Sequence, residues 1–449
     1  MIDPAEYIAS RRERAEQTIA ICREIYPMRG LIVSPDIDRG FEIIKRHFPD
    51  VVIHEYPTGM ACEDWIVPHS WRATSGTLTD SDGRVLASLD EHFLFVAAYS
   101  EPVDGWFTKA EIGDRYRTRP DQPDCYVLEH RNAYDYRRVD WGITLPHAVW
   151  EAMSDTAKYH IKIEVEKQPG SLKAAEWFLP GEREETICIN SQFDELCNDG
   201  HSSAVLGLQI MQWLKQKKNR QFSYQLLLTP EMFGTLFYIL NNLPRVANTV
   251  GMLNLETLGA GEQWLFKHTQ TADTFLDDAL ACSFADLGLA YREDGFFTGY
   301  GNDERVYAWP SLGIPGVALQ RHPFAFYHTS KDTPDILSVE LFAESLAISE
   351  RFIEIVESSY VPAYKNIVQP WLTRHGLYFD HYVAPEDFQR LNNLALFNIN
   401  GKHSLLELTK ISGVKFDVLQ TYLEKFFEKG LLEKRALPVD RPARHLHNR

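Results

Sequence analysis

From about residue 155 onward, segments with the apolar pattern of strands alternate with segments that have the pattern of helices. The strand-like segments are HIKIEVE, TICINSQF, SYQLLLT, TVGMLNLE and GVALQ, and the helical ones cover 202–217, 231–241, 272–287 and 337–358. This alternation predicts an α/β fold, with a mixed or parallel sheet that has helices on both faces. Ligands of such sheets bind at the carboxyl ends of the strands, so we look for a functional site among the residues that follow each strand.

Two stretches differ from this α/β pattern. Residues 61–152 hold short β-like runs separated by turn signals, and they predict an inserted, mostly β domain. Residues 366–435 have the pattern of three helices and a short hairpin-like end, which is the outline of a winged helix. A polar tail at 436–449 follows, and residues 1–60 and 153–365 are expected to form one discontinuous α/β domain.

Composition excludes several classes of function. The chain has 449 residues and a net charge of -17, and a surface this acidic repels a phosphate backbone, which argues against nucleic-acid binding. We therefore assign the winged helix a structural or oligomerising role and expect a homo-oligomer. There is no run of about 18 apolar residues, so we expect no membrane partner. The polar N-terminus and the scattered cysteines, which form no CxxC pair, predict a cytoplasmic protein with reduced thiols.

Acidic residues follow three of the predicted strands. The strand ICINSQF leads into a polar turn that contains Asp194, Glu195 and Asp199. Glu231 comes after the next strand and opens a helix, and Glu256 ends the strand after that. Taken singly, each has an ordinary structural explanation, because Asp is a preferred N-cap and Glu is favoured in the first turn of a helix.

A histidine joins these acids in the loop FYHTSKDTPD, where His328 could by itself be an ordinary surface or core residue. At successive strand ends of one sheet, however, three carboxylates and an imidazole can converge on one cleft. That ligand set suits Zn²⁺ or a similar divalent ion, which lowers the pKa of water and polarises a carbonyl group. A carboxylate that is not a ligand then serves as the general base. The pattern predicts hydrolysis of an amide.

A second charged group lies in GNDERVY, where Asp303, Glu304 and Arg305 precede a Trp-Pro pair. One interpretation is a solvated loop. The other is a substrate site in which an acid holds an α-amino group and Arg305 orients a carboxylate. Arg321 follows the strand GVALQ and is expected to line the same cleft.

The order ICINSQFDELCNDG, TPEMFG, NLETLG, GIPGVALQ and YHTSKDTPD resembles the zinc aminopeptidases with a phosphorylase/hydrolase-like α/β fold. DWIVPHSW, GYGNDERVYAWP and RHGLYFD further resemble a bacterial aminopeptidase-like group that is often found near surface-polysaccharide biosynthesis genes. Much of that group is catalogued as a domain of unknown function. The resemblance implies a zinc-exopeptidase-like fold with an inserted β domain and a C-terminal winged helix.

The resemblance also implies roles for individual residues. Asp199 matches the aspartate that bridges two metal ions, and His328 matches the histidine of the first metal site. Glu231 stands where the group has a pair of glutamates, so it is either the general base or a metal ligand. Glu256 stands where the group has an aspartate ligand of the second metal.

The first motif departs from the group. Gln192 stands at the position of a histidine ligand, and a neutral amide oxygen binds transition metals weakly. Asp194 holds the place of the aspartate that orients this histidine, and Glu195 aligns with a histidine of related chains. An imidazole ligand is therefore expected to be missing, with Asp194 or Glu195 in its place. We expect a degraded second site and one bound ion, Zn²⁺ or alternatively Mn²⁺.

The leading hypothesis is a metal-dependent, aminopeptidase-like hydrolase that acts on a small peptide or an aminoacyl amide. One alternative is a single-metal acyl transferase or cyclase of the same fold, because the glutaminyl cyclases resemble this arrangement. A second is a non-catalytic binding protein with a degenerate metal site, which the missing imidazole favours. A winged-helix regulator is a further alternative that a salt-dependent DNA complex would support.

Overall fold

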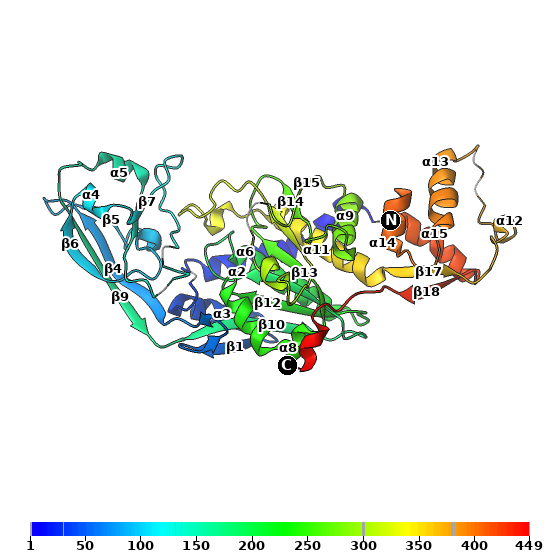
Figure 1. The fold of residues 1–449 in the computed structure, drawn as a ribbon. Helices are drawn as coiled ribbons and strands as arrows, with labels where there is room; N and C mark the ends of the chain where they lie inside the picture. Colours follow the sequence, from blue (N-terminus) through cyan, green and yellow to red (C-terminus); the bar gives the residue numbers. More distant parts are fainter. Residues whose placement is uncertain are drawn as a thin grey trace.

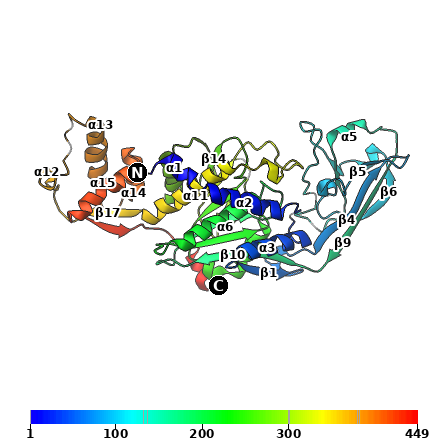
Figure 2. The same ribbon diagram turned by 180° about the vertical axis from the view of Figure 1, so that it is seen from behind.

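The computed structural model describes residues 2–29, 31–130, 132–135, 137–298, 301–378, 380 and 382–448. The molecule is elongated (Figure 1), with a large sheet at its centre, a smaller sheet at one end and the C-terminal helices at the other. Seen from behind (Figure 2), helix α1 (Pro4–Ala9) lies next to the C-terminal helices. The N-terminal helix and the C-terminal helices are therefore neighbours at one end of the molecule, whereas the last residues of the chain return to the central part, beside α8 (Leu243–Val246).

The central sheet has eight strands in the order β1-β10-β12-β11-β13-β16-β14-β15. The strands are β1 (Val52–Pro57), β10 (Ser171–Leu179), β12 (Ser223–Thr229), β11 (Thr186–Gln192), β13 (Thr249–Glu256), β16 (Gly316–Arg321), β14 (Trp264–Lys267) and β15 (Tyr291–Asp294). The four middle strands β12, β11, β13 and β16 are parallel, and antiparallel pairs flank them on both sides. The predicted mixed sheet is confirmed, and the parallel strands end at one edge.

Helices cover both faces of this sheet. One layer contains α2 (Arg12–Ile25), α3 (Pro35–His47), α6 (His201–Gln216), α9 (Phe275–Leu287) and α11 (Val339–Ser358), which the 3-10 turn Pro334–Ile336 precedes. The other contains α7 (Phe233–Asn241), α8 (Leu243–Val246) and α10 (Glu304–Tyr307). In β11, Ile187 and Ile189 pack in the first core and Cys188 packs in the second. Successive strand residues point to opposite faces, so both faces must be apolar, which explains the unbroken apolar runs.

The inserted region forms a four-stranded sheet in the order β5-β4-β9-β6. These strands are β5 (Val85–Ser88), β4 (Ser70–Thr79), β9 (Tyr159–Gln168) and β6 (Val103–Phe107). β9 pairs antiparallel with β4 along its whole length. The expected end of the inserted domain, residue 152, lies before β9. Because β9 pairs with β4, this strand belongs to the inserted sheet.

Shorter elements complete this region. They are β2 (Ala61–Cys62), β3 (Trp65–Ile66), the 3-10 turn Phe93–Phe95, α4 (Lys109–Ile112), β7 (Tyr116–Arg117), β8 (Ile143–Thr144) and α5 (His147–Ala152). Most of the chain between β6 and β9 therefore runs in loops. One of these loops reaches the carboxyl edge of the central sheet, as described below.

The C-terminal region is helical and ends in one strand. Its elements are α12 (Leu372–His375), α13 (Pro385–Asp387), the π-helix Phe388–Ala395, α14 (Leu405–Ser412), α15 (Phe416–Glu428), β18 (Leu432–Ala436) and the 3-10 turn Arg444–Asn448. Ser404 and Glu407 form a reciprocal cap at the start of α14, and Gly413 ends that helix in the left-handed conformation. The prediction of a hairpin-like end is wrong, because β18 pairs antiparallel with β17 (Tyr360–Tyr364), the strand that follows α11. The winged helix stays a prediction.

Two further expectations concerned the cell compartment. Among the described residues, no helix combines the length and the apolar character that crossing a bilayer requires. The six cysteines are free thiols; Cys62 and Cys282 are partly exposed and the others are buried. Both observations describe the chain and leave its location in the cell a prediction.

Candidate active site

Acidic side chains gather at the carboxyl ends of the parallel strands. Asp194 and Glu195 follow β11 directly, Asp199 precedes α6, and Glu256 is the last residue of β13. All four are at least nine-tenths buried, with Asp199 fully so. Buried carboxylates need a compensating charge, so their convergence at one edge of the sheet marks a cation site.

The loop after β11 has a backbone that few side chains would adopt. Glu195 has a φ of 64° and Gly200 a φ of 103°. A Cβ atom on Gly200 would lie 2.3 Å from the carbonyl oxygen of Asp194, so only glycine fits. His328, on the facing loop, also has a positive φ, of 56°. Such conformations persist where the surrounding structure enforces them, and they cluster at functional sites.

Asp332 holds the turn in place. Its carboxylate accepts hydrogen bonds from the backbone N–H groups of Asn198 at 2.7 Å and Asp199 at 3.0 Å. Burial raises the pKa of Asp332 to about 7, despite these two donors. Asp332 therefore fixes the backbone of the loop that carries Asp199.

Two imidazoles meet the carboxylates. His328 Nε2 lies 3.0 Å from Glu195 Oε2 and 3.0 Å from Asp199 Oδ2, and His130 Nε2 lies 3.3 Å from Glu195 Oε1. One ligand atom each from His130, Glu195 and His328 lie within 4.8 Å of one another. This is the spacing of side chains that can bind one ion together.

His130 corrects the expectation that an imidazole ligand is missing. It comes from a loop of the inserted region, not from the strand-end motifs, and it lies near Glu195 Oε1, whereas His328 lies near Oε2. The only signal in the sequence was its place directly after the strand-like run CYVLE. No local spacing connects that run with Glu195 or His328, which is why sequence reasoning missed it.

The loops that carry the two histidines are hydrogen-bonded to each other. Leu128 donates its backbone N–H to the carbonyl oxygen of His328 at 2.8 Å, and Val127 forms an antiparallel bridge with Thr329. Arg119 donates to the carbonyl oxygen of Tyr327 at 3.0 Å. The inserted region is therefore part of the site, and its docking sets the distance between His130 and His328.

The charges at the site do not balance. Burial alone would raise the pKa of Glu195, but His328 and His130 hold it well below its usual range. Burial would lower the pKa of His328, yet Glu195 and Asp199 raise it to about 11. Burial, and then the charge of Glu195, raise the pKa values of Asp194 and Asp199 well above their usual range. The excess of buried carboxylates favours a bound cation.

The residues present fit a divalent metal ion. Among the described residues, Asp194 Oδ1 is a buried carboxylate oxygen with no hydrogen-bond donor, and Asp199 Oδ2 has only the contact with His328 Nε2, at 3.0 Å. Such oxygens are rare in a buried site unless an ion or water satisfies them. Two imidazole nitrogens with carboxylate oxygens are a donor set that zinc accepts.

Glu231 lies beside this group, where β12 leads into α7. Its backbone N–H donates to Asp194 Oδ2 at 3.2 Å, and its Oε2 accepts a hydrogen bond from the Tyr134 hydroxyl at 3.2 Å. Burial, then Glu195 and Asp194, raise the pKa of Glu231 well above its usual range. The side chain remains partly exposed.

Gln192 contacts Asp199 through its amide nitrogen, not through its amide oxygen. Its Nε2 donates to Asp199 Oδ1 at 3.0 Å, and its Oε1 accepts from Asn302 Nδ2 at 2.6 Å. The amide oxygen, the atom that could bind a metal, is therefore engaged by Asn302. Glu256 lies outside the His130, Glu195 and His328 group and accepts a hydrogen bond from Gln320. Its role as a ligand stays a prediction.

Asp303 and Glu304 are buried, so a solvated loop is wrong for these two residues. Asp303 accepts hydrogen bonds from Asn190 Nδ2 and the Met232 N–H, each at 2.8 Å. Glu304 Oε1 accepts from the buried Lys267 at 3.0 Å. These contacts brace the loops around Glu231, whereas a role in binding substrate stays a prediction.

The predicted arginines lie in different environments. Arg305 is exposed. Arg321 is buried, forms an ion pair with Glu344 of α11 and lies 3.8 Å from the ring centroid of Trp264. Because Glu344 belongs to the helix layer, these contacts of Arg321 point to a packing role. Substrate binding by either arginine stays a prediction.

His201 illustrates a histidine that does not join the site. It is the first residue of α6 and is fully buried, and neither ring nitrogen has a hydrogen-bond partner. Burial lowers its pKa to about 3, so the ring is neutral. It is not one of the residues that converge with Glu195 and His328.

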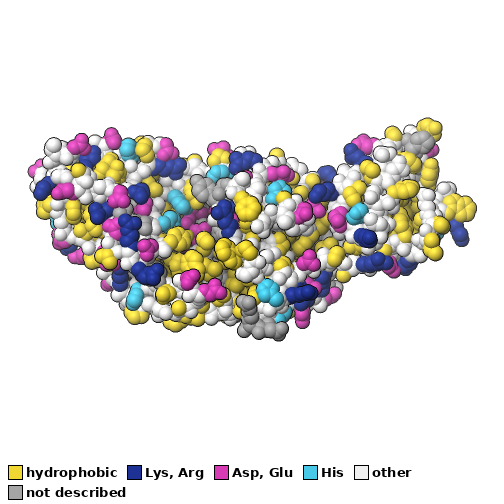
Figure 3. All heavy atoms as spheres, in the orientation of Figure 1, with side chains coloured by type: hydrophobic (Ala, Val, Ile, Leu, Met, Phe, Trp, Pro, Cys, Tyr) yellow, Lys and Arg dark blue, Asp and Glu magenta, His cyan; other side chains and the backbone are white. Residues whose placement is uncertain are grey.

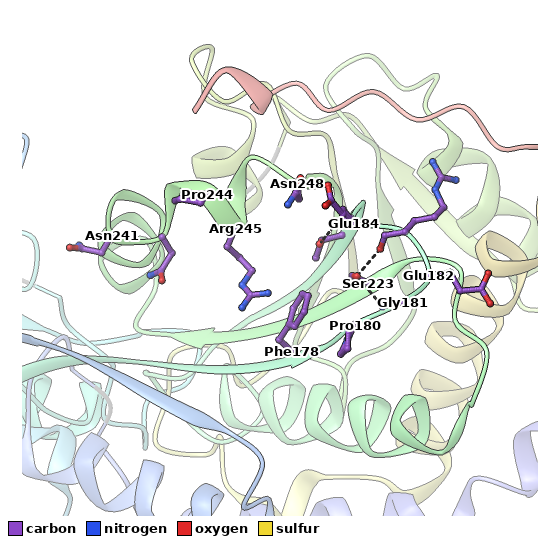
Figure 4. Close-up of a pocket in the computed structure, with 13 residues that line it drawn as sticks. Phe178, Pro180, Gly181, Glu182, Glu184, Ser223, Asn241, Pro244, Arg245 and Asn248 are labelled. Carbon is purple, nitrogen blue, oxygen red and sulfur yellow. Dashed lines mark hydrogen bonds between the residues drawn. The ribbon is translucent and has the colours of Figure 1, made fainter. Parts of the chain in front are cut away.

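A hollow of about 690 Å³ lies in another part of the molecule (Figure 4). It is lined by Thr186 and Ser223, where the parallel strands β11 and β12 begin, and by Arg245 of α8. It therefore opens at the edge of the sheet opposite the acidic site. Acidic and basic side chains line this hollow, and no histidine is among its lining residues. We therefore place the candidate active site at the carboxyl edge, where imidazole and carboxylate groups converge.

The chain is similar to several known proteins. A Clostridium acetobutylicum protein, named as a polysaccharide biosynthesis protein with an aminopeptidase-like domain, is 26% identical over 441 residues, which are 95% of this chain and 98% of that protein. A crystal structure described as a peptidase from the same organism has a TM-score of 0.82 at 24% identity and covers 96% of this chain and 99% of that one. BSAP, a zinc aminopeptidase from Bacillus subtilis, has a TM-score of 0.56 at 11% identity, covering 76% and 94%.

These likenesses to solved structures establish the fold, which is that of the zinc aminopeptidases. The resemblance drawn from the sequence motifs is thereby confirmed. A model of the family described as a domain of unknown function, DUF4910, matches residues 19–359. The chain belongs to the DUF4910 family.

Proposed function

We propose that this protein is a single-metal, aminopeptidase-like hydrolase that cleaves an amide bond of a small peptide or aminoacyl compound. The observation that carries the proposal is the convergence of His130, Glu195 and His328 on one point, with Asp199 beside them. The three groups come from three separate segments of the chain, and a shared cation would compensate the excess of buried carboxylates around them. The fold, which zinc aminopeptidases share, supports the same reaction class.

The ion is proposed to be Zn²⁺. Without His130, a set of carboxylates would have favoured Mn²⁺ or another hard ion, but two imidazoles shift the preference toward zinc. The hydrogen bond from Gln192 to Asp199 Oδ1 occupies an oxygen that a bridging aspartate would offer to a second ion. A bound ion would supply a Lewis acid that polarises an amide carbonyl and lowers the pKa of water.

Glu231 is proposed as the general base. Tyr134 fixes one carboxylate oxygen by its 3.2 Å hydrogen bond, and this orients the other. A carboxylate with a raised pKa accepts a proton from an attacking water more readily than an ordinary glutamate does. The proton can then pass to the amine that leaves when the amide bond breaks.

Tyr327 is proposed to stabilise the oxygen of the reacting carbonyl. Its ring stacks on His328 with centroids 3.8 Å apart. Burial, then Asp199 and Glu195, raise its pKa, so the hydroxyl stays protonated and can donate. A donor placed where negative charge develops lowers the barrier to attack on the carbonyl.

The negative charge of the site also favours a substrate with a free amino group. Asp194 and Glu256 are buried beside the proposed ligands, and burial together with neighbouring carboxylates raises both pKa values, to about 7 for Glu256. A protonated α-amino group would offset that repulsion. This supports an N-terminal aminoacyl substrate over a neutral amide.

The test begins with the metal content of untagged protein prepared without chelators. We expect about one zinc per chain and hydrolysis of aminoacyl amides, with Glu231→Gln retaining the metal and losing turnover. Glu184→Gln, at an exposed position, is the control. Protein that takes up no metal after incubation with Zn²⁺ and Mn²⁺ would overturn the proposal.

The single-metal geometry also supports the acyl transferase or cyclase as a second candidate, because one set of ligands converges among the described residues. Product mass separates the two reactions, since hydrolysis adds water and cyclisation of an N-terminal glutamine releases ammonia. The non-catalytic alternative rested on the missing imidazole, and His130 removes that argument.

A further inference from the structure

Exposed apolar side chains are concentrated in one stretch of the C-terminal region. Of the sixteen large hydrophobic side chains that are most exposed among the described residues, seven lie between 367 and 397. They are Ile367, Val368, Trp371, Tyr378, Tyr382, Val383 and Phe397. Single exposed apolar residues are normal, but a cluster of this size marks a contact surface.

Several of these residues surround a groove of about 270 Å³. Its apolar lining includes Ile367, Val368, Pro370, Leu372, Leu396 and Phe397. The residues that line it include no charged side chain, although the whole chain carries a net charge of -17. We call this groove, with the adjacent Trp371, the C-terminal apolar surface; Figure 3 shows hydrophobic side chains over this end of the molecule.

We infer that the C-terminal apolar surface is the contact with a second copy of this chain. The first argument is the area available. Trp371 and Phe397 are 69% and 73% exposed, Ile367 and Val368 are at least 75% exposed, and aromatic side chains of this kind bury about 150–250 Å² each. With the exposed aliphatic residues they present roughly 600–700 Å² per copy, close to the ~800 Å² per partner of a stable interface.

The second argument is the shape of the surface. It offers both a groove and protruding side chains, since Phe397 lines the groove and Trp371 lies beside it. In a two-fold contact the same patch serves both partners, so protrusions of one copy must fit a recess of the other. A surface with both features can satisfy that requirement without a different partner.

The third argument is charge. Two copies that each carry a charge of -17 repel each other, and a stable contact must lie where no acidic group is desolvated. The uncharged groove is such a place. Because salt screens the repulsion, dimerisation should become stronger as ionic strength rises, whereas a basic partner would bind more weakly. The inference does not depend on the proposed enzyme activity.

The test is the oligomeric state of the full-length protein, measured by sedimentation velocity over a micromolar concentration series at low and high salt. We expect a dimer that becomes tighter at high salt. Trp371→Glu and Phe397→Asp should each weaken the dimer by about thirtyfold or more, as expected for central aromatic contacts. Both side chains are exposed, so circular dichroism should show folded protein.

Trp309→Glu is the matched control, because Trp309 is 66% exposed, close to the 69% of Trp371, but lies after α10. We expect it to remain dimeric. A wild-type monomer at high concentration and high salt would overturn the inference. So would a dimer that survives both C-terminal substitutions, or one that Trp309→Glu weakens as strongly as Trp371→Glu does.

Discussion

His130 and His328 lie with their ring centroids 5.4 Å apart, and the carboxylate of Glu195 is within ion-pair distance of both. One histidine belongs to the inserted region and the other to the loop after β16. Backbone hydrogen bonds join the two loops, so the inserted region supplies part of the site and fixes its geometry. The predictions below test this arrangement and the groups that support it.

His130→Ala should reduce zinc affinity by at least about a hundredfold, because even residues that only support a ligand change affinity by 10–100-fold. The measurement is competition with a chromophoric chelator. His160→Ala, which removes a histidine paired with Asp104 on the inserted sheet, should leave zinc affinity unchanged. Equal affinity in wild type and His130→Ala would show that His130 is not a ligand.

Asp332→Asn should destabilise the fold by about 1–3 kcal/mol, because an amide can accept only one of the two backbone hydrogen bonds and places a donor at the other. Zinc affinity should fall as well, since the turn that positions Asp199 loosens. Urea unfolding and metal titration provide the two readings. The exposed Asp335→Asn is the control, and a similar loss there would contradict this account.

Asp303 should make the stability of the metal-free protein depend on pH. Burial raises its pKa from 3.8 to about 6, so the native state holds this proton more tightly than the unfolded chain does. The tighter binding of this proton adds roughly 3 kcal/mol to the free energy of unfolding below about pH 4. This stabilisation is lost as pH rises through about 6. In chelator, urea unfolding of Asp303→Asn should show a shallower fall across this range than wild type. Parallel curves would contradict the prediction.

Lys267→Met should destabilise the protein by about 3–5 kcal/mol, because it leaves Glu304 buried without its cation. Adding Glu304→Gln should recover much of that loss, since the uncompensated charge is removed. Lys215→Met is the matched control: its ion pair with Asp50 is about half exposed, and its removal should cost less than about 1 kcal/mol. Chemical unfolding of the wild type and the three variants measures all these effects, and equal losses in the two single lysine variants would refute the explanation.

Local patterns in the sequence were sufficient for much of this molecule. Apolar runs that alternate with helical segments predicted the mixed sheet, and parallel strands bring Glu195, Asp199 and Glu256 to one edge. The reciprocal cap of Ser404 and the left-handed Gly413 followed from residues within one helical turn. In each case the interaction that decides the structure joins neighbours in the sequence, or residues with the same place on adjacent strands.

Other features depended on contacts between distant segments. β18 pairs with β17 and β9 joins the inserted sheet, because an open strand edge can accept any strand that reaches it. The burial of Glu304, on α10, depends on Lys267, which is the last residue of β14. None of these pairings leaves a periodic signal in the amino-acid sequence.

The sequence by itself therefore determined the fold class and most of the acidic residues at the carboxyl edge, because hydrophobic period and strand direction are local properties. The tertiary structure alone decided that His130 completes the group around Glu195 and that Gln192 donates to Asp199 instead of offering its oxygen. The physical reason is that both depend on how two loops dock, and docking is set by backbone hydrogen bonds between segments that only folding brings together.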